Sequence, residues 1–391
     1  MNQRLIRALL VTAVAAVAIV PVACGGSDSG SSNTWRIGLE APLSGDQKNL
    51  GEGMLRGAEL AANQINEKGG LLGREVEIVS IDDAADPKTG VKAAREALDS
   101  GLDGVIGPYN SGVGLETLPI YIDAGLVPIR LTSDTATNGL GFTLQPMTSQ
   151  IAPVAAEAME EWLGAGSVGI IYDDSTAYTK TIEKEVTKDL EADGVSVSSV
   201  AIKPGKSDYS KEVSSLADQG VDVIYLAVYF PEGAKLATEM FDQKVDAQCM
   251  ADYASYDNGF IQDAGEEVAQ SCPVVGVPAP DDFEKSGLYV KSYEEDFDED
   301  PGTWSPYTYD SMNFLAEGVR QTKGFNSKKL NEVLGEVEGW EGWTGTVDID
   351  AKTGNRDPAT VVVTRVNRGG QFSTDMAWAE AVASGKPYRG G

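Results

Sequence analysis

The sequence of 391 residues contains no histidine. Histidine is the base of Ser-His-Asp and Cys-His active sites and a common zinc ligand, so its absence excludes those catalytic sites and histidine-ligated metals. We expect neither a metal nor a cofactor. Basic residues are also scarce, with 31 Lys and Arg against 60 Asp and Glu, a formal net charge of −29. Such a charge repels phosphate groups, so nucleic acid and anionic lipid surfaces are not expected partners.

One short apolar run lies near the N-terminus. Arg4 and Arg7 precede apolar residues 8–20, an arrangement typical of a secretory signal and too short to span a bilayer permanently. Cys24 follows and is succeeded by a flexible Gly/Ser-rich stretch. These features predict a signal peptide over residues 1–23 and a lipid-anchored linker over 24–34, with Cys24 lipidated.

This interpretation has an alternative, because Pro21 stands where such lipidation motifs usually carry leucine. An ordinary cleaved signal followed by a chance cysteine would place the protein free in the periplasm. Otherwise the lipid would hold it at the outer face of the cytoplasmic membrane. In this oxidising exterior the two remaining cysteines, Cys249 and Cys272, are expected to form a disulfide, the alternative being two free buried thiols.

From Trp35 onward, strand-like runs alternate with amphipathic helices. The first helix has Met54, Ala58, Ala61 and Ile65 at helical spacing. This alternation predicts βαβ units and two doubly wound parallel sheets, which makes the fold class α/β with two Rossmann-like lobes joined by a hinge. The expected strands are residues 35–42, 74–82, 103–109, 126–132, 167–174, 196–202, 221–229 and 247–251.

The character changes after Pro278. Residues 281–297 and 305–322 are expected to be helices, and residues 345–350 with 359–372 a late hairpin. Neither stretch makes a third α/β domain, so each is expected to return to one of the first two. The predicted N-terminal lobe is 35–147 plus 279–342, and the predicted C-terminal lobe is 148–278 plus 343–391.

Motifs in order along the chain resemble one family. The N-terminal third contains PLSG, G-A-x-x-A, IN-x-x-GG-x-x-G and DD-x-x-DP, followed by GVIGPYNSG, and later segments include DDSTAYTK, VYFPE and EGWTGTVDIDAKTGNR. Over nearly the whole mature chain this resembles the leucine/isoleucine/valine-binding proteins, type I periplasmic solute-binding proteins of ABC importers. The resemblance implies three hinge crossings and a ligand trapped between the lobes. Because the family also includes amide, urea and aromatic-acid receptors, it does not name the solute.

In the first lobe, the resemblance implies two loops that bind the ligand carboxylate. Ser111, beside Asn110, matches the family serine, and the helix that begins there favours an anion through its free N–H groups. The simpler interpretation of Ser111 is a helix N-cap. The second loop is Thr132, Ser133 and Asp134, where Asp134 replaces the usual threonine. An acceptor-only carboxylate would repel a ligand carboxylate, so Asp134 either caps a helix or meets a cationic or hydroxyl-rich group.

In the second lobe, Tyr178 and Tyr229 match the aromatic ligand contacts of the family. The ammonium-binding acid of the family lies in the loop that reads Asp252-Tyr253 here, with Tyr253 at the glutamate position and Asp252 next to it. Trp304 is a further aromatic candidate from the returning segment.

These observations predict a membrane-tethered, monomeric substrate-binding lipoprotein that captures an amino acid or amide-like solute by hinge closure and delivers it to an ABC permease. We expect no enzymatic activity, since no nucleophile–base pair is visible. A sensory receptor that passes its closed state to a signalling partner is the alternative, and a secreted enzyme is the third hypothesis.

Overall fold

The computed structural model describes residues 34–283 and 286–384. The predicted signal peptide, Cys24 and the linker therefore lie outside the described residues, apart from Thr34. Within the described ranges, no helix has the length and apolar character needed to cross a membrane.

The first lobe is built on a parallel sheet in the order β2-β1-β3-β4. Ile37 of β1 pairs with Ile78 on one side and Gly104 on the other, in the register expected for buried apolar strands. Its strands are β1 Thr34–Ala41, β2 Glu75–Asp82, β3 Gly104–Ile106 and β4 Pro128–Ile129.

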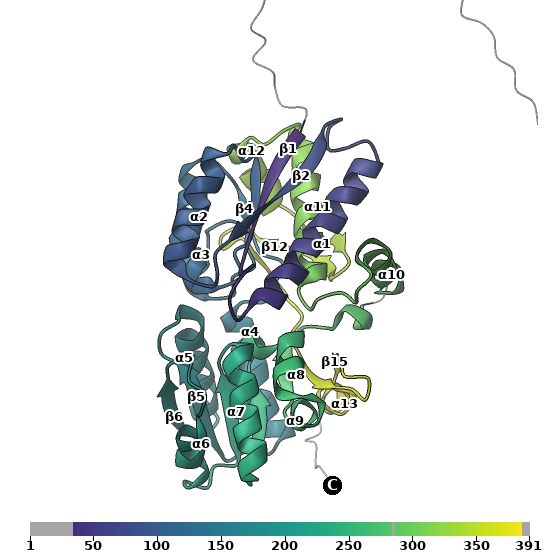
Figure 1. Cartoon of the computed structure of the whole chain (residues 1–391). Coiled ribbons are helices and arrows are strands. Elements are labelled where there is room, and N and C mark those ends of the chain that lie inside the picture. The colour runs from purple at the N-terminus through teal and green to yellow at the C-terminus, as the bar shows by residue number, and fades with distance from the viewer. Residues whose placement is uncertain (1–33, 284–285, 385–391) are drawn as a thin grey trace, which may run out of the picture. The chain divides into compact units, whose positions relative to one another are not determined.

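Helices cover both faces of this sheet (Figure 1), with α1 and α11 together on one face and α2 and α3 on the other. The start of α2 follows from local chemistry, because Asp86 accepts a 2.8 Å hydrogen bond from the Thr89 amide and Pro87 occupies the first turn. The helices of this lobe are α1 Lys48–Glu67, α2 Pro87–Asp99, α3 Ser111–Asp123, α10 Ser286–Phe297, α11 Ser305–Thr322 and α12 Ser327–Gly335.

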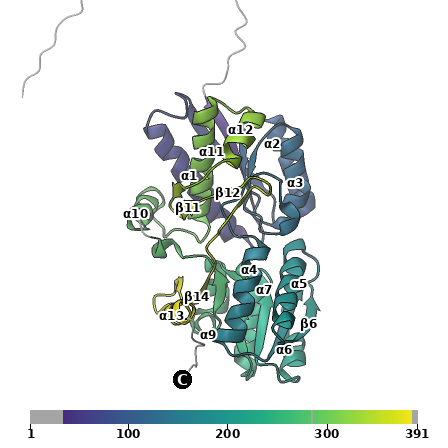
Figure 2. The ribbon, with the colours of Figure 1, turned by 180° about the vertical axis from the view of Figure 1, so that it is seen from behind.

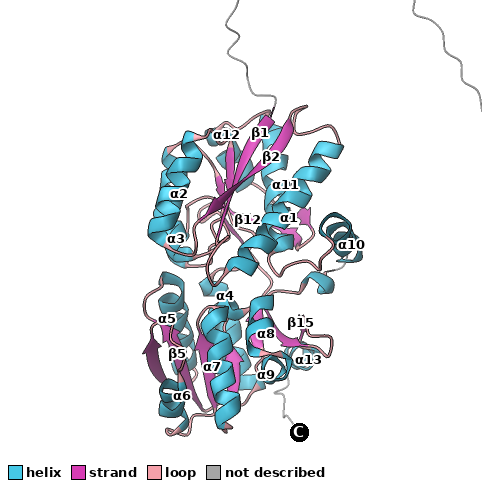
Figure 3. Cartoon of the chain, viewed as in Figure 1, coloured by secondary structure: helices cyan, strands magenta, loops and turns pink. Residues whose placement is uncertain are grey.

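The second lobe has a larger mixed sheet in the order β15-β14-β9-β8-β7-β5-β6, visible as the lower group of strands in Figure 3. Strands β5 to β9 are parallel, whereas β14 is antiparallel to both β9 and β15. Its strands are β5 Ser167–Asp173, β6 Ser196–Ile202, β7 Val223–Ala227, β8 Gln248–Ala251, β9 Val274–Gly276, β14 Val362–Val366 and β15 Phe372–Thr374.

Helices again cover this sheet on both faces. Helices α4 and α5 lie together on one face, and Figure 2 shows the molecule from that side. Helices α6 and α7 lie on the opposite face. The helices are α4 Thr148–Glu157, η2 Ala158–Trp162, α5 Ala177–Ala192, α6 Ser210–Ala217, α7 Phe230–Gln243, α8 Asn258–Ala264, α9 Glu266–Ser271 and α13 Met376–Ser384. Short 3₁₀ turns are η1 Thr135–Thr137, η3 Tyr253–Ser255 and η4 Pro280–Asp282.

The chain passes between the two sheets three times, after β4, after β9 and after β13. The two-lobed α/β fold expected from the alternation of strands and helices is therefore present.

The late hairpin and the last lobe boundary differ from the expectation. Residues 345–350 divide between two small sheets, β10 Trp340–Gly342 with β11 Gly345–Val347, and β12 Ile349–Asp350 with β13 Asn355–Arg356. Asn355 pairs with Thr143 of the first lobe, and β14 pairs with β15 rather than with residues 345–350, at the edge of the second sheet. Because these contacts hold residues 340–356 against the first lobe, we propose that the second lobe resumes after Arg356 rather than at residue 343.

A disulfide joins Cys249 of β8 to Cys272, just before β9. It connects the starts of two neighbouring parallel strands, and the two cysteines are separated by 23 positions in the sequence. The predicted pairing of the two cysteines is confirmed.

Candidate ligand-binding site

A small buried cavity lies at the carboxyl ends of strands from both sheets, where open α/β sheets usually bind ligands. Every lining residue is at most 8% exposed. The cavity is lined by Tyr109, Ser111, Leu131 and Ser133 of the first lobe and by Tyr178, Tyr229, Tyr253 and Ala254 of the second. Five residues predicted from the sequence thus meet at one cavity, namely Ser111, Ser133, Tyr178, Tyr229 and Tyr253.

The helix α3 presents its N-terminus to this cavity. Asn110 occupies the N-cap position without a capping side-chain bond, and Ser111 is the first helical residue rather than the cap. The Ser111 hydroxyl accepts a hydrogen bond of 3.2 Å from the Asp134 amide, which leaves its own proton free to donate. Asn110 donates from Nδ2 to Gln47 at 3.0 Å and does not line the cavity.

The three candidate residues in the loop after β4, Thr132, Ser133 and Asp134, have different surroundings. Ser133 lines the cavity, and its buried hydroxyl has no hydrogen-bond partner among the described residues. Thr132 does not line the cavity, and its hydroxyl lies 2.9 Å from that of Thr137. This arrangement leaves Ser133 as the member of the loop that can bind a solute.

Asp134 caps a turn and also connects the lobes. Its Oδ1 accepts a 2.8 Å hydrogen bond from the Ala136 amide at the start of η1, and its Oδ2 accepts a 3.0 Å bond from the Thr181 hydroxyl on α5. The capping interpretation of Asp134 therefore holds. Since Asp134 is absent from the cavity lining, its predicted contact with the ligand stays a prediction.

Tyrosines form most of the cavity wall. The ring centroids of Tyr109 and Tyr229 are 6.3 Å apart and those of Tyr178 and Tyr229 are 6.1 Å apart. Trp304 lies behind this wall, with its ring 5.3 Å from that of Tyr109 and 5.2 Å from that of Tyr253. Tyr109 is not among the residues predicted from the sequence, although it lies between β3 and Asn110.

The hydroxyl of Tyr229 lies at the N-terminus of α3. Burial raises the pKa of Tyr229, while the neighbouring Asn110 side chain and Ser111 amide act in the opposite direction. By contrast, the buried hydroxyls of Tyr178 and Tyr253 have no hydrogen-bond partner at normal distance within the described residues. The site thus holds unused polar atoms that a solute would satisfy.

Asp252 lies behind the tyrosine wall rather than in it. The Tyr225 hydroxyl donates to its Oδ1, and the Ala254 amide donates to its Oδ2 at 3.0 Å. Burial raises the pKa of Asp252 to about 6, against the stabilising effect of these hydrogen bonds on the carboxylate. Asp252 is the residue that the sequence predicts for an ammonium group, yet it does not line the cavity. Its predicted role stays untested.

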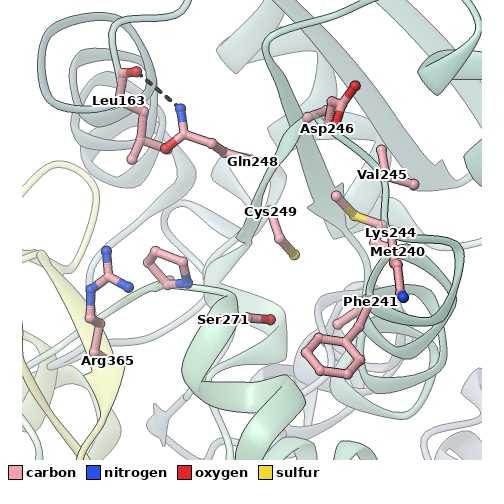
Figure 4. A pocket seen from close by; sticks show the side chains of 13 residues that line it. Leu163, Met240, Phe241, Lys244, Val245, Asp246, Gln248, Cys249, Ser271 and Arg365 are labelled. Atoms are coloured by element: carbon pink, nitrogen blue, oxygen red, sulfur yellow. Dashed lines mark hydrogen bonds between the residues drawn. The ribbon is translucent and has the colours of Figure 1, made fainter. Parts of the chain in front are cut away.

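A second hollow, of about 830 Å³ and open to solvent, lies on the second lobe where α7 ends and β8 begins. Figure 4 shows Phe241 and Lys244 on one side of it and Arg365 on the other, with Cys249 between. None of the ten predicted ligand-binding residues lines this hollow. Among the described residues, no group of three His, Cys, Asp or Glu side chains could hold a metal ion.

Comparisons with known proteins agree with this architecture. The model of the periplasmic binding protein family matches residues 34–371. A curated relative, Leu/Ile/Val-binding protein homolog 2 of Brucella abortus (strain 2308), is 27% identical over 326 residues, which cover 81% of this chain and 86% of the relative.

Solved structures share the fold. A leucine binding protein from Thermotoga maritima MSB8 superposes with a TM-score of 0.81 at 21% identity, covering 87% of this chain and 97% of that protein. A solute-binding protein of an R. palustris ABC transporter, in complex with benzoate, gives a TM-score of 0.78 at 20% identity, covering 87% and 95%. The chain therefore belongs to the periplasmic binding protein family.

Proposed function

We propose that this protein is the extracytoplasmic receptor of an ABC importer and that it closes its two lobes around an amino acid or a similarly small polar solute. The family consists of solute-binding proteins rather than enzymes, and its solute-binding role is carried over to this chain. The curated relative is a homologue of Leu/Ile/Val-binding proteins, which favours an amino-acid-like solute and a permease partner.

One observation supports the proposal above others, namely that residues from both lobes line a single buried cavity with unused hydroxyl groups. A ligand that contacts both lobes makes more contacts in the closed state than in the open state. Binding therefore shifts the population toward the closed state. An analogue that lacks one polar group would leave buried hydroxyls unpaired, and this gives selectivity.

The anchoring and delivery steps are part of the same proposal. Lipidation of Cys24 would hold the protein at the outer face of the cytoplasmic membrane beside its permease. Mass spectrometry of the exported protein would detect the lipid, and a Cys24→Ser variant should move from the membrane fraction to the soluble fraction. A wild-type protein recovered without lipid contradicts the anchor while leaving the receptor role intact.

A thermal-shift screen across amino acids, amides, polyamines and aromatic acids, followed by calorimetry, tests the receptor role, because a ligand bound to the native state raises its stability. Ser111→Ala and Tyr229→Ala should each weaken the best hit by about tenfold or more. Phe241→Leu, at the solvent-open hollow, is the matched control and should leave affinity unchanged. The proposed site fails if the Ser111 and Tyr229 variants both bind like wild type.

A further inference from the structure

The cavity walls contain no charged side chain. All eight lining residues are tyrosine, serine, leucine or alanine. A solute with a net charge on one end must therefore be held there by neutral groups. Hydrogen-bond donors and aromatic rings occupy different parts of the cavity lining.

One end offers hydrogen-bond donors that suit an anion. The Asn110 side chain does not cap α3, and the Tyr229 hydroxyl lies beside the Ser111 amide. The Ser111 hydroxyl keeps a proton to donate, and the Ser133 hydroxyl is buried without a hydrogen-bond partner among the described residues. Free amide groups at a helix N-terminus together with hydroxyl donors suit a carboxylate.

The other end is enclosed by aromatic rings. The rings of Tyr109 and Tyr178 lie 6.3 and 6.1 Å from that of Tyr229 and are inclined to it by 63° and 48°, as walls of an enclosure rather than as a parallel stack. Tyr253 closes the same cavity. A cation between such rings lies within the roughly 6 Å over which the ring quadrupole attracts it.

Two buried carboxylates lie behind these rings and add negative potential. The charge of Asp252 raises the pKa of Tyr178, Tyr109 and Tyr229, and the charge of Asp134 also raises the pKa of Tyr229. Each carboxylate already accepts hydrogen bonds from the protein at both oxygens, and neither lines the cavity. The two carboxylates can therefore attract a positive charge in the cavity without accepting a hydrogen bond from it.

We propose that the solute is a small betaine-type zwitterion, whose carboxylate binds at the α3 N-terminus and whose methylated ammonium group is enclosed by the four tyrosine rings. The inference rests on the proposed receptor function and names its solute class. A methylated ammonium has few or no N–H donors, so it fits a cage of ring faces and loses nothing from the absence of a free carboxylate acceptor. A primary ammonium would find no lining carboxylate to pair with, and only neutral tyrosine hydroxyl oxygens could accept its N–H groups.

Calorimetric titration with four glycines of increasing N-methylation tests the proposal, from glycine through N-methylglycine and N,N-dimethylglycine to N,N,N-trimethylglycine. Affinity should rise along this series, by about tenfold or more from first to last. An affinity that falls as methyl groups replace N–H donors would overturn the proposal, because it would indicate a direct ammonium–carboxylate pair.

The neutral isostere 3,3-dimethylbutanoate separates attraction of the cation from apolar packing. It has the carboxylate and the branched shape of trimethylglycine but no positive charge. We expect it to bind about tenfold more weakly than trimethylglycine or worse. Equal affinity would overturn the proposal in favour of an apolar or aromatic acid.

Ring substitutions locate the effect. Tyr178→Leu should lower the affinity for trimethylglycine by about tenfold, whereas Tyr178→Phe, which keeps the ring, should lower it by less than about threefold. Equal losses in the two variants would indicate that the hydroxyl, not the ring, holds the solute, and would contradict the cage. The control is again Phe241→Leu.

Failure of this inference can be told apart from failure of the receptor role. Binding of L-leucine or L-valine that depends on Ser111, without any preference for methylated ammonium groups, overturns the cage and keeps the receptor. No binding by any solute of either series, or of the broader thermal-shift screen, counts against both.

Discussion

The hydroxyl of Thr181 on α5 donates a hydrogen bond of 3.0 Å to the Oδ2 of Asp134, and this bond joins the second lobe to the first. It exists only when the lobes are together, so it should stabilise the closed form. Thr181→Ala is expected to weaken solute binding by about fivefold, equivalent to about 1 kcal/mol for a partly exposed bond to a charged acceptor.

Calorimetry of Thr181→Ala against the best solute measures this loss. Thr187→Ala, on the same helix but bonded within the lobe to Glu183, is the matched control and should bind as wild type. Asp134→Asn keeps an acceptor for Thr181, so a loss as large as that of Thr181→Ala would show that the charge matters beyond the single bond. Wild-type affinity in Thr181→Ala would contradict the closing role.

The disulfide between Cys249 and Cys272 should contribute about 3 kcal/mol to the free energy of unfolding, the amount that the chain-entropy model gives for closing a loop of this length. Urea unfolding of a double Cys249→Ala and Cys272→Ala variant would measure the loss. Reduced wild-type protein is the control and should behave like the variant. If an alkylating reagent modifies both thiols of the exported protein without prior reduction, the bond is absent in solution.

Buried carboxyl groups predict that the free energy of unfolding falls as the pH rises from acidic values to neutral. Glu40 and Asp83 are both inaccessible to solvent, and burial raises the pKa of Asp83 to about 7. Burial, with the charge of Asp83 adding to it, also raises the pKa of Glu40. A carboxyl group with a raised pKa in the folded state binds its proton more tightly there than in the unfolded chain. Its contribution to the free energy of unfolding therefore declines between about pH 4 and pH 7 and stays low above that.

Asp83→Asn tests this dependence. The introduced amide keeps an oxygen for the Ala85 amide and removes the charge, so the variant should be more stable than wild type at pH 8 by about 1 kcal/mol or more. Urea midpoints at pH 5 and pH 8 give the comparison, with the exposed Asp99→Asn as control. Some dependence should remain, because burial also raises the pKa of Asp257 to about 7. A variant that is less stable than wild type at both pH values would contradict the interpretation.

The close packing of α1 on α11 depends on Gly57. A Cβ at this position would lie 2.1 Å from the Ser305 carbonyl oxygen and 2.4 Å from the Thr308 hydroxyl. Gly57→Ala should destabilise the protein by about 2 kcal/mol or more, since the two helices would have to separate. Gly287→Ala in α10 is the control, because nothing lies within 4 Å of its added Cβ. That exposed helical change should be neutral or stabilising by about 0.5–1 kcal/mol in the same unfolding experiment.

Local patterns sufficed to predict most of the fold, because each βα unit has its own turn and cap residues. Asp86-Pro87 before α2 and the buried strand at residues 221–229 are examples, and both elements form near the expected positions. The expected hairpin of residues 345–350 with 359–372 was wrong, because the strands of this region are two or three residues long and carry no periodic pattern. Their partners, such as Thr143 opposite Asn355, lie far away in the sequence.

The candidate site could be predicted only in part. Motif positions identified Ser111, Tyr178 and Tyr229, and these meet at the cavity. Whether Asp134 and Asp252 can bind a solute depends on which protein groups already donate hydrogen bonds to their carboxylates. Thr181 donates to Asp134 and Tyr225 donates to Asp252 through tertiary contacts that spacing does not reveal, whereas the Ala254 amide is a local partner of Asp252.

Burial of the cavity walls has a kinetic consequence. With every lining residue at most 8% exposed, and with the Thr181–Asp134 and Asn49–Gln262 bonds spanning the lobes, a trapped solute has to wait for those bonds to break. Its residence time cannot be shorter than the time that the closed lobes take to open, and contacts of the solute with both lobes lengthen that time. Solutes that make more such contacts should consequently leave more slowly, and a permease that holds the lobes apart would reduce the difference between them.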